Sequence, residues 1–341
     1  MANGWRRVGL IVNPSAGQGA AQSMHAARNA IERLGAQEVF TGRGQMGATA
    51  LLGWSGQAQV HDLASVTGRE ETRALARWIA ERNADAVIVV GGDGTLSDVA
   101  QVCFETESRL PILGIGTGST NAGRLITCRA TRSQELDPDE LEFWNADCLF
   151  ATVDGRLLGL GFNDVVIGHT VVGIINGERR DLDAAERMQE NAVSGVPRRI
   201  GNRRTRVTRS APGLTTLLAE GESVGTVVAG FAEPAFFGKA VSGGVCLTTL
   251  AGLPAGCLVC DTPLVQVGIA AETVLNAPPV ISTYVSLSDG VSIAVERVNE
   301  GAALCVDGNP LRLLTESDRV VISVRRRVVV GVRANKDMRS A

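Results

Sequence analysis

The stretch VIVVGGDGTLSDVA, residues 87–100, determines how the rest of the chain is interpreted. The apolar residues 87–90 are typical of a buried strand, and residues 96–100 begin a helical pattern. Between them lies Gly91-Gly92-Asp93-Gly94-Thr95. Glycines in such a turn let backbone N–H groups approach phosphate oxygens, and the helix that follows adds the positive end of its dipole. The stretch therefore predicts a phosphate-binding turn that carries one carboxylate.

Two other predicted strands end in turns of the same kind. NPSAGQG at residues 13–19 follows RVGLIV, and GTGSTN at residues 116–121 follows LPILGI. Ligands of an open parallel sheet bind beyond the carboxyl ends of its strands, so we expect the three turns to form one nucleotide site. The candidate phosphate- and nucleotide-binding residues are Asn13, Gly17, Gly91, Gly92, Gly94, Thr95, Gly118, Ser119, Thr120 and Asn121.

Asp93 is the candidate catalytic residue. Phosphoryl transfer requires an aligned donor and acceptor, Mg²⁺ to neutralise charge, and a group that orients or deprotonates the attacking hydroxyl. A carboxylate flanked by glycines can lie beside bound phosphates, so Asp93 is predicted to act as the base or to hold the metal. The alternative is that Asp93 only caps a helix that begins near Thr95. The chain has no P-loop lysine motif, and GTGSTNAG differs in spacing from the dinucleotide fingerprint.

The order of predicted elements indicates an α/β fold with two domains. Up to about residue 135, short apolar runs alternate with helical patterns, which predicts a Rossmann-like parallel sheet with helices on both faces. One more helix is expected in DPDELEFWN, residues 137–145. Beyond it, valine- and threonine-rich runs are separated by Asp-Gly turns at residues 154–155, 289–290 and 307–308, apart from a helical DLDAAERMQENAV at 181–193. We expect a nucleotide-binding domain over residues 1–135 and a β-rich, sandwich-like substrate domain over residues 136–341.

Composition and charge limit the possible partners. The chain of 341 residues has 33 basic and 36 acidic side chains and only 4% aromatic residues, which argues against nucleic acid as a partner. No run of 18 apolar residues occurs, and the seven cysteines are scattered, so we expect no membrane partner and a cytoplasmic location. The pair Cys257 and Cys260 has metal-ligand spacing but no second pair, and no metal ligands are identified.

These motifs resemble the NAD kinase and diacylglycerol kinase superfamily. The resemblance rests on the turn that contains Asp93 and on NPSAG at residues 13–17. Within the superfamily the chain is similar to the ATP-NAD kinase/AcoX branch, through GTGSTNAGRL, GLGFNDVVIG, ESVGTVVAGFAEP and AALCVDGNPLRLLTESDRVVISV. The resemblance implies that the protein uses ATP, with Mg²⁺ as cofactor, to phosphorylate a hydroxyl of NAD or a related small metabolite. The reaction is expected in a cleft between the domains.

The resemblance also assigns roles to residues. It implies that Asp93 is the base toward the acceptor hydroxyl and that the pair Asn163-Asp164 binds the substrate. A polar strand start is the alternative for that pair. A small-molecule or nucleotide substrate and a homo-oligomer are expected.

The chain departs from NAD kinases in one respect. It has no Thr-Gly-Ser-Thr-Ala-Tyr turn in the second domain, where VSGG at residues 241–244 is the nearest glycine-rich turn. Two alternatives therefore stay open: a lipid kinase of the diacylglycerol type, and a nucleotide sensor without catalysis. The arginine-rich PRRIGNRRTRVTR at residues 197–209 is interpreted as a solvated face, with a phosphate-binding role for one or two arginines as the alternative. His169 is interpreted as a strand residue.

Overall fold

The chain folds into two compact units, which contain Met1–Asp147 with Arg326–Ala341, and Cys148–Arg325. The computed structural model describes residues 5–17, 19–63, 66–118, 121–175, 178–231, 253, 255–263, 271–335 and 338. The first unit is therefore assembled from both ends of the sequence, whereas the second is a continuous segment.

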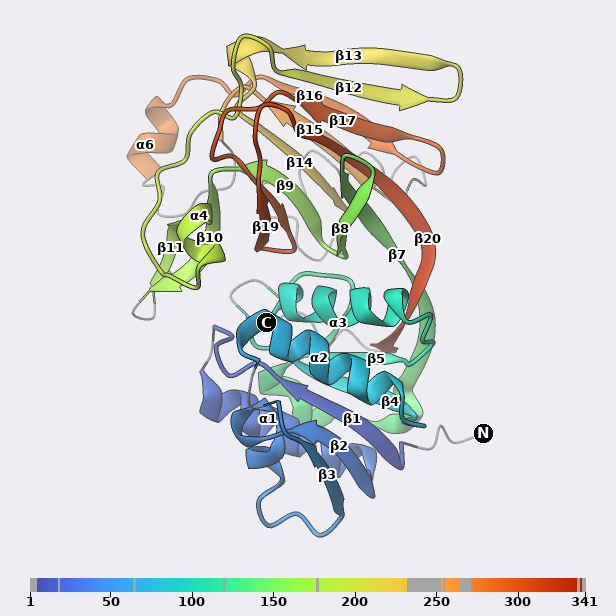
Figure 1. Ribbon diagram of the computed structural model, residues 1–341. Helices are drawn as coiled ribbons and strands as arrows, with labels where there is room; N and C mark the ends of the chain where they lie inside the picture. Colours follow the sequence, from blue (N-terminus) through green and yellow to red (C-terminus); the bar gives the residue numbers. More distant parts are fainter. Residues whose placement is uncertain are drawn as a thin grey trace. The chain divides into compact units, whose positions relative to one another are not determined.

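The first unit is a parallel sheet with helices on both faces (Figure 1). Its strands are β1 Arg7–Val12, β2 Glu38–Gly42, β3 Gln57–His61, β4 Ala86–Gly91, β5 Ile112–Gly116 and β6 Ile126–Arg129. They lie in the order β6-β5-β4-β1-β2-β3, and each adjacent pair is parallel. Its helices are α1 Ala20–Leu34, α2 Gly68–Ala80 and α3 Asp93–Glu105, with the short 3₁₀ helices η1 Gly44–Met46, η2 Ala48–Leu51, η3 Ala130–Glu135 and η4 Pro138–Glu140.

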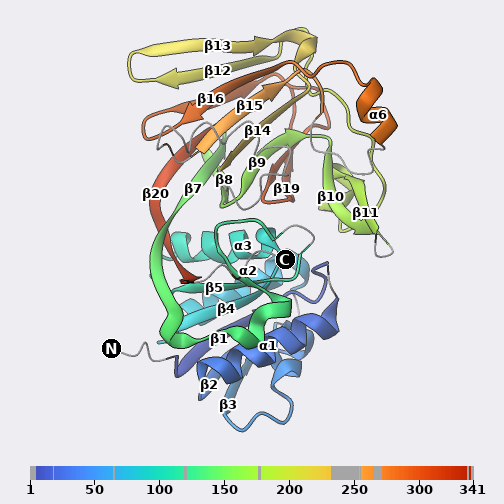
Figure 2. The same ribbon diagram turned by 180° about the vertical axis from the view of Figure 1, so that it is seen from behind.

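The alternation of side chains along the strands explains the two helical layers. Val8, Leu10 and Val12 of β1 are fully buried in one apolar cluster with Ala27 and Ile31 of α1. Because successive strand residues point to opposite faces, the residues between them face the other helical layer. Figures 1 and 2 show α2 and α3 side by side on the face opposite α1. A sheet buried on both faces needs nearly continuous apolar strands, which β1 and β4 provide.

An ion pair joins the two neighbouring helices. The Arg69 Nε atom on α2 donates to Asp98 Oδ1 on α3 at 2.6 Å, and the Asp98 side chain is buried. Farther along the same helices, Arg73 makes two bonds to the Glu105 carboxylate, at 2.9 and 3.0 Å. These pairs fix the position of α3 on the sheet.

The second unit is built mainly from antiparallel strands. Its strands are β8 Arg156–Gly161, β9 Asp164–Gly168, β10 Thr170–Ile175, β11 Glu178–Asp183, β12 Arg206–Ala211, β13 Leu214–Glu220, β14 Thr226–Phe231, β15 Ala255–Cys260, β16 Ser282–Leu287, β17 Ser292–Glu296, β18 Ala303–Val306 and β19 Asn309–Leu313. The short helices are α4 Ala184–Met188, η5 Gly221–Ser223 and α6 Ala271–Asn276. Two long strands, β7 Leu141–Val153 and β20 Arg319–Ala334, belong to both units.

Two sheets enclose the core of this unit. One contains β13-β12-β17-β20, and the other contains β16-β15-β14-β9-β18-β19. A single apolar cluster draws buried side chains from both sheets. Its members include Val207, Ile293 and Ile322 from the first sheet and Val165, Val227 and Val259 from the second. The unit is thus a sandwich of two sheets with a shared core.

The expected fold class is confirmed, whereas one predicted helix is wrong and another is shorter than predicted. Residues 137–145 form only the 3₁₀ turn η4 before β7 begins, although Asp137 does cap that turn through the Asp139 N–H. Residues 181–193 contain the end of β11 and the short α4. In both segments a favourable N-cap residue and an acidic first turn suggest a helix. Residues 141–145 instead pair as part of β7, and residues 181–183 pair as the end of β11.

Strand β20 completes the first unit with residues from the end of the chain. Its Arg319–Ser323 part pairs with β17, and its Gly331 pairs with Ile112 of β5. The Thr127 hydroxyl of β6 donates to the Val332 carbonyl at 2.7 Å, and Val332 is buried in the cluster under α1. The parallel sheet that carries the three turns therefore depends on residues more than 200 positions later in the sequence.

Candidate nucleotide site

The three glycine-rich turns leave neighbouring strands at the same edge of the parallel sheet. Val12, the last residue of β1, is aligned with Val90 of β4, and Gly91, the last residue of β4, is aligned with Gly116 of β5. Parallel strands in this register end side by side. The turns after β1, β4 and β5 are therefore neighbours, as the sequence predicts.

Asn13 joins the first turn to the second. Its backbone N–H donates to the Val90 carbonyl at 2.8 Å, and its side-chain Nδ2 donates to the Thr95 hydroxyl at 2.9 Å. The Asn13 Oδ1 atom accepts the Ser15 N–H at 3.0 Å, which shapes the turn that follows β1. The asparagine thus contacts both turns and orients Thr95, which is itself buried.

The second and third turns meet backbone to backbone. The Thr117 N–H donates to the Gly91 carbonyl at 2.9 Å. A Cβ atom added to Gly118 would lie 2.8 Å from the Gly92 Cα atom, a separation that real Cβ atoms do not show. Glycine at position 118 is therefore required by this close approach. The contact brings the N-terminus of α3 next to the third turn.

The carboxylate of Asp93 links α3 to the segment after the third turn. Its Oδ1 atom accepts the Gly123 N–H at 2.8 Å, and its Oδ2 atom accepts the Ala122 N–H at 3.1 Å. Asp93 is the first residue of α3 and is half-buried, and the N-cap position is Gly92, so the carboxylate does not cap its own helix. A carboxylate has about four acceptor positions, so two N–H donors orient it and leave acceptor capacity on both oxygens.

The N-terminus of α3 points its first amides toward the same edge. The first N–H groups of an α-helix have no acceptor within the helix, and they favour an anion. Two buried oxygens of the third turn, Thr117 Oγ1 and Asn121 Oδ1, make no hydrogen bond to any residue that the structure describes. The Asn121 Nδ2 atom donates to the Gly118 carbonyl at 2.8 Å. Buried polar atoms without partners are rare in folded proteins and often mark functional sites.

The remaining predicted residues of this site fall into two groups. Gly17 is exposed in the turn after β1, and Gly94 is buried in the first turn of α3. Ser119, Thr120 and the turn at residues 241–244 lie outside the described residues. The structure therefore brings together Asn13, Gly91, Gly92, Asp93, Gly94, Thr95, Gly118 and Asn121 at one sheet edge.

The predicted pair Asn163-Asp164 lies at the corner between β8 and β9 in the second unit. The Asn163 Nδ2 atom donates to Asp164 Oδ2 at 3.1 Å. The backbone N–H groups of Phe162, Asn163 and Asp164 all donate to the buried Asp307 carboxylate, at 2.7, 2.8 and 2.9 Å. Sequence reasoning identified Asp307 only as a turn residue, because nothing in the pattern brings residues 162–164 near residue 307.

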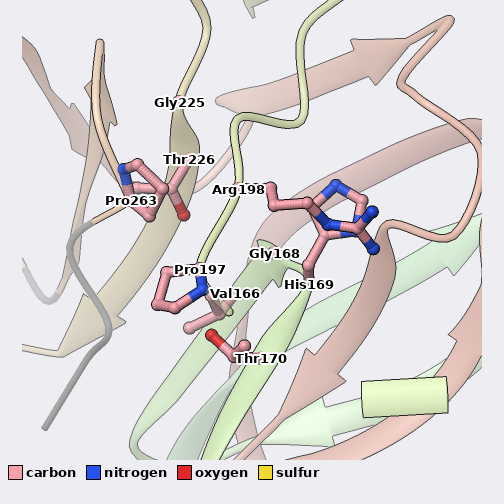
Figure 3. A pocket seen from close by; sticks show the side chains of 9 residues that line it. All are labelled: Val166, Gly168, His169, Thr170, Pro197, Arg198, Gly225, Thr226 and Pro263. Atoms are coloured by element: carbon pink, nitrogen blue, oxygen red, sulfur yellow. The ribbon is translucent and has the colours of Figure 1, made fainter. Parts of the chain in front are cut away.

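A small hollow on the second unit contains His169 (Figure 3). His169 is buried in the bend between β9 and β10, and its Nδ1 atom donates to the Gly301 carbonyl at 3.0 Å. Burial lowers the pKa of His169, and the positive charge of Arg198 lowers it further. The contact with a backbone carbonyl is typical of a structural histidine, but His169 lies between two strands, so its prediction as a strand residue is wrong.

The arginine-rich segment forms ion pairs at the surface. Arg203 pairs with Glu222 at 3.2 Å, and Arg204 pairs with Glu316 at 2.6 Å. The four side chains of these pairs are exposed, as expected for a solvated face.

The two cysteines of the Cys257-x-x-Cys260 motif do not face each other. Both cysteines lie on β15, where residues three positions apart point to opposite faces. Burial raises the pKa of Cys257 to about 12 and that of Cys260 to about 11. Among the described residues, no three His, Cys, Asp or Glu side chains are grouped to hold a metal. Within the same residues, no helix has both the length and the apolar character needed to span a membrane.

Comparisons with known proteins agree with this architecture. Residues 7–128 match the family model of the diacylglycerol kinase catalytic domain. An uncharacterized protein of Archaeoglobus fulgidus is 26% identical over 307 residues, which cover 89% of this chain and 92% of that protein.

Two solved kinase structures share the fold. The crystal structure of a candidate diacylglycerol kinase from Bacillus anthracis strain Sterne has a TM-score of 0.51 and 14% identity, and the alignment covers 96% of each chain. Yeast NADH kinase in complex with NADH has a TM-score of 0.52 and 12% identity, with 98% of this chain and 84% of that chain covered. The family model matches the part of the chain that carries the parallel sheet, and the two kinase structures share the fold of nearly the whole chain.

Proposed function

We propose that the protein is an ATP-dependent kinase that phosphorylates a hydroxyl of NAD or a related small metabolite, in the manner of the ATP-NAD kinase/AcoX branch. The observation that carries the proposal is the convergence of three glycine-rich turns on Asp93 and the N-terminus of α3. Phosphoryl transfer depends mainly on positioning and on electrostatic stabilisation, and this arrangement supplies both.

The residues of the first unit fit a polyphosphate. The N-terminus of α3 supplies backbone N–H donors and the positive end of a helix dipole. Gly92 and Gly118 themselves present only backbone atoms where the two turns meet. Asn121 Oδ1 and Thr117 Oγ1 are further polar atoms at this edge, and they have no hydrogen-bond partner among the described residues. Mg²⁺ bound with ATP would neutralise the charge that develops on the phosphates.

Asp93 is assigned the role of base toward the acceptor hydroxyl. Its carboxylate is fixed by the two N–H bonds from residues 122 and 123, so it does not have to be ordered during the reaction. A fixed orientation is what proximity catalysis requires, because the acceptor oxygen must lie within hydrogen-bond reach of the base. If another group accepts the proton of the acceptor hydroxyl, the Asp93 carboxylate would instead hold the Mg²⁺ ion.

The acceptor is assigned to the pair Asn163-Asp164. Both side chains carry oxygens, which accept hydrogen bonds from hydroxyl groups, and the Asn163 amide can also donate. The backbone that carries this pair is held by the Asp307 carboxylate. These features favour a hydroxyl-rich acceptor over one that presents phosphate oxygens to the pair.

A second candidate is a lipid kinase of the diacylglycerol type. The observation that favours it is the match of residues 7–128 to the diacylglycerol kinase catalytic domain. The two candidates share the phosphate donor and Asp93, and they differ only in the acceptor. A panel of acceptors therefore separates them.

The test measures ADP release from Mg-ATP in the presence of NAD, NADH, small polyols or diacylglycerol micelles. We expect turnover with a soluble acceptor and a decrease in turnover of about 10²- to 10⁴-fold in Asp93→Asn, the usual effect of removing a positioned base. Asp85→Asn is the matched control. Asp85 also accepts a backbone N–H, from Arg7 at 2.8 Å, but it precedes β4 at the opposite edge of the sheet.

Three results would change the assignment. Turnover only with diacylglycerol micelles supports the lipid kinase. Binding of ATP without turnover on any acceptor supports a nucleotide sensor. Equal turnover in Asp93→Asn and Asp85→Asn contradicts the role assigned to Asp93.

A further inference from the structure

Asp307 occupies a tight turn whose shape does not explain its contacts. Val306 and Asn309 are paired, so Asp307 and Gly308 form a two-residue loop between β18 and β19. Their φ angles are 48° and 81°, which is the left-handed conformation that Asp-Gly adopts in hairpin turns. Turn formation alone would leave the carboxylate in solvent, yet the Asp307 side chain is only 6% exposed.

The buried carboxylate is satisfied by three consecutive backbone N–H groups. Oδ2 accepts the Phe162 N–H at 2.7 Å, and Oδ1 accepts those of Asn163 and Asp164 at 2.8 and 2.9 Å. In return, the Asp307 N–H donates to the Asp164 carbonyl at 3.0 Å. A buried carboxylate is costly unless it is compensated by hydrogen bonds, so this set of contacts fixes the corner between β8 and β9 to the hairpin.

We propose that Asp307 is a positioning residue for the acceptor site, which acts by holding the backbone of residues 162–164 so that Asn163 and Asp164 keep one orientation. This proposal rests on the proposed function for the role of the pair. The two side chains also contact each other, from Asn163 Nδ2 to Asp164 Oδ2 at 3.1 Å, on the backbone that Asp307 holds. Asp307 itself need not touch the substrate.

A second Asp-Gly turn in the same unit provides a matched control. Asp154 and Gly155 form the two-residue loop between β7 and β8, with φ angles of 50° and 80°. The Asp154 carboxylate accepts one backbone N–H, from Arg319 at 3.1 Å, and makes none of the bonds to residues 162–164. Asparagine is as suitable as aspartate in this type of turn, so Asp307→Asn and Asp154→Asn both retain the hairpin.

The two variants differ in what they remove. In Asp307→Asn, one of the two carboxylate oxygens becomes an NH₂ group, which faces an N–H donor and cannot accept from it. We expect amide hydrogen exchange at residues 162–164 to become about 10- to 100-fold faster, because a hydrogen bond to a charged group is lost there. Exchange in β15 and β17 should stay as in the wild type, and Asp154→Asn should leave residues 162–164 unchanged.

Kinetics on the acceptor then separate positioning from stability. For the acceptor that supports ADP release, we expect Asp307→Asn to raise the KM of the acceptor about 10-fold or more and to leave the KM of ATP unchanged. Asp164→Asn combined with Asp307→Asn should raise the acceptor KM no further than Asp164→Asn alone, because residues that act as a unit are not additive.

The exchange measurement needs no substrate, so it decides whether Asp307 holds the backbone of residues 162–164 even if no acceptor is phosphorylated and the proposed kinase function fails. The proposal is overturned if residues 162–164 exchange at equal rates in Asp307→Asn and Asp154→Asn. Faster exchange spread evenly over the second unit would also overturn it, since that outcome indicates a general loss of stability. Additive effects of the two substitutions on the acceptor KM would show that Asp307 does not act through Asp164.

Discussion

Gly123→Ala moves the Asp93 carboxylate without changing its chemistry. A Cβ atom at position 123 would lie 2.8 Å from Asp93 Oδ1 and 3.2 Å from its Cγ atom. Ordinary contacts of a Cβ atom begin near 3.4 Å, so the carboxylate must move by about 0.6 Å, the difference between 3.4 and 2.8 Å. The carboxylate is the movable end of a side chain, and the φ angle of Gly123 is not in the left-handed region, so the variant should fold.

The displacement removes the hydrogen bond from the Gly123 N–H, which is 2.8 Å long in the wild type. A hydrogen bond to a charged group contributes about 1.5–3 kcal/mol, and the lower value applies to a half-buried carboxylate. For a unit of this size, about 1.5 kcal/mol corresponds to a decrease in Tm of about 3–6 °C. Misplacement of a catalytic group by 1 Å can cost about 10²-fold in rate, so we expect kcat to decrease about 10- to 100-fold.

The assay combines thermal unfolding with ADP release, and Gly168→Ala serves as the control. A Cβ atom at Gly168 would meet its nearest neighbour, a methyl carbon of Val166, at 3.7 Å, which is an ordinary contact. We expect the control to keep kcat, and the KM of ATP to be unchanged in Gly123→Ala. Wild-type kcat in Gly123→Ala, at a Tm lowered as calculated, would refute the assignment of Asp93 as a positioned base.

Two further predictions concern buried groups outside the site. Burial raises the pKa of Asp98 to about 6, although the charge of Arg69 opposes this shift. The folded protein therefore holds the Asp98 proton more tightly than the unfolded chain does. The stability that results is lost as the pH rises through about 6. The difference in unfolding free energy between wild type and Asp98→Asn should therefore fall by about 1.4 kcal/mol from pH 5 to pH 7.5 in urea titrations, and a difference that is constant or rises would contradict the raised pKa. Burial also raises the pKa of Cys257 and Cys305 to about 12. Iodoacetamide at pH 8 should therefore leave both thiols unmodified in the native protein and modify them in concentrated guanidinium chloride. Mass spectrometry maps the modified cysteines.

The parallel half of the fold was predictable because its signals are local. Strands β1, β4 and β5 are continuous apolar runs, and each is followed by a turn whose glycines are visible in the sequence. Gly35 ends α1 in the left-handed conformation, as its position after the last apolar residue predicts. Once the strands are known to be parallel, the convergence of the three turns follows from topology.

The features that sequence reasoning missed depend on contacts between distant segments. The bonds of Asp93 to Ala122 and Gly123 span about thirty positions, and those of Asp307 to the 162–164 corner span more than 140. A single sequence contains no signal for such pairings. Residues 141–145 were predicted to be helical, but they begin β7, which pairs with β20 from the far end of the chain as well as with β8.

The position of β20 has a consequence for how the protein is made. A ribosome releases residues in order, so the continuous segment Cys148–Arg325 is available for folding while the parallel sheet still lacks its last strand. Only when Gly331 and Val332 have emerged can they join β5 and β6. We therefore expect the unit with the parallel sheet to mature last during synthesis, although its first strands are translated first, and a fragment that ends before β20 to lack a complete first unit.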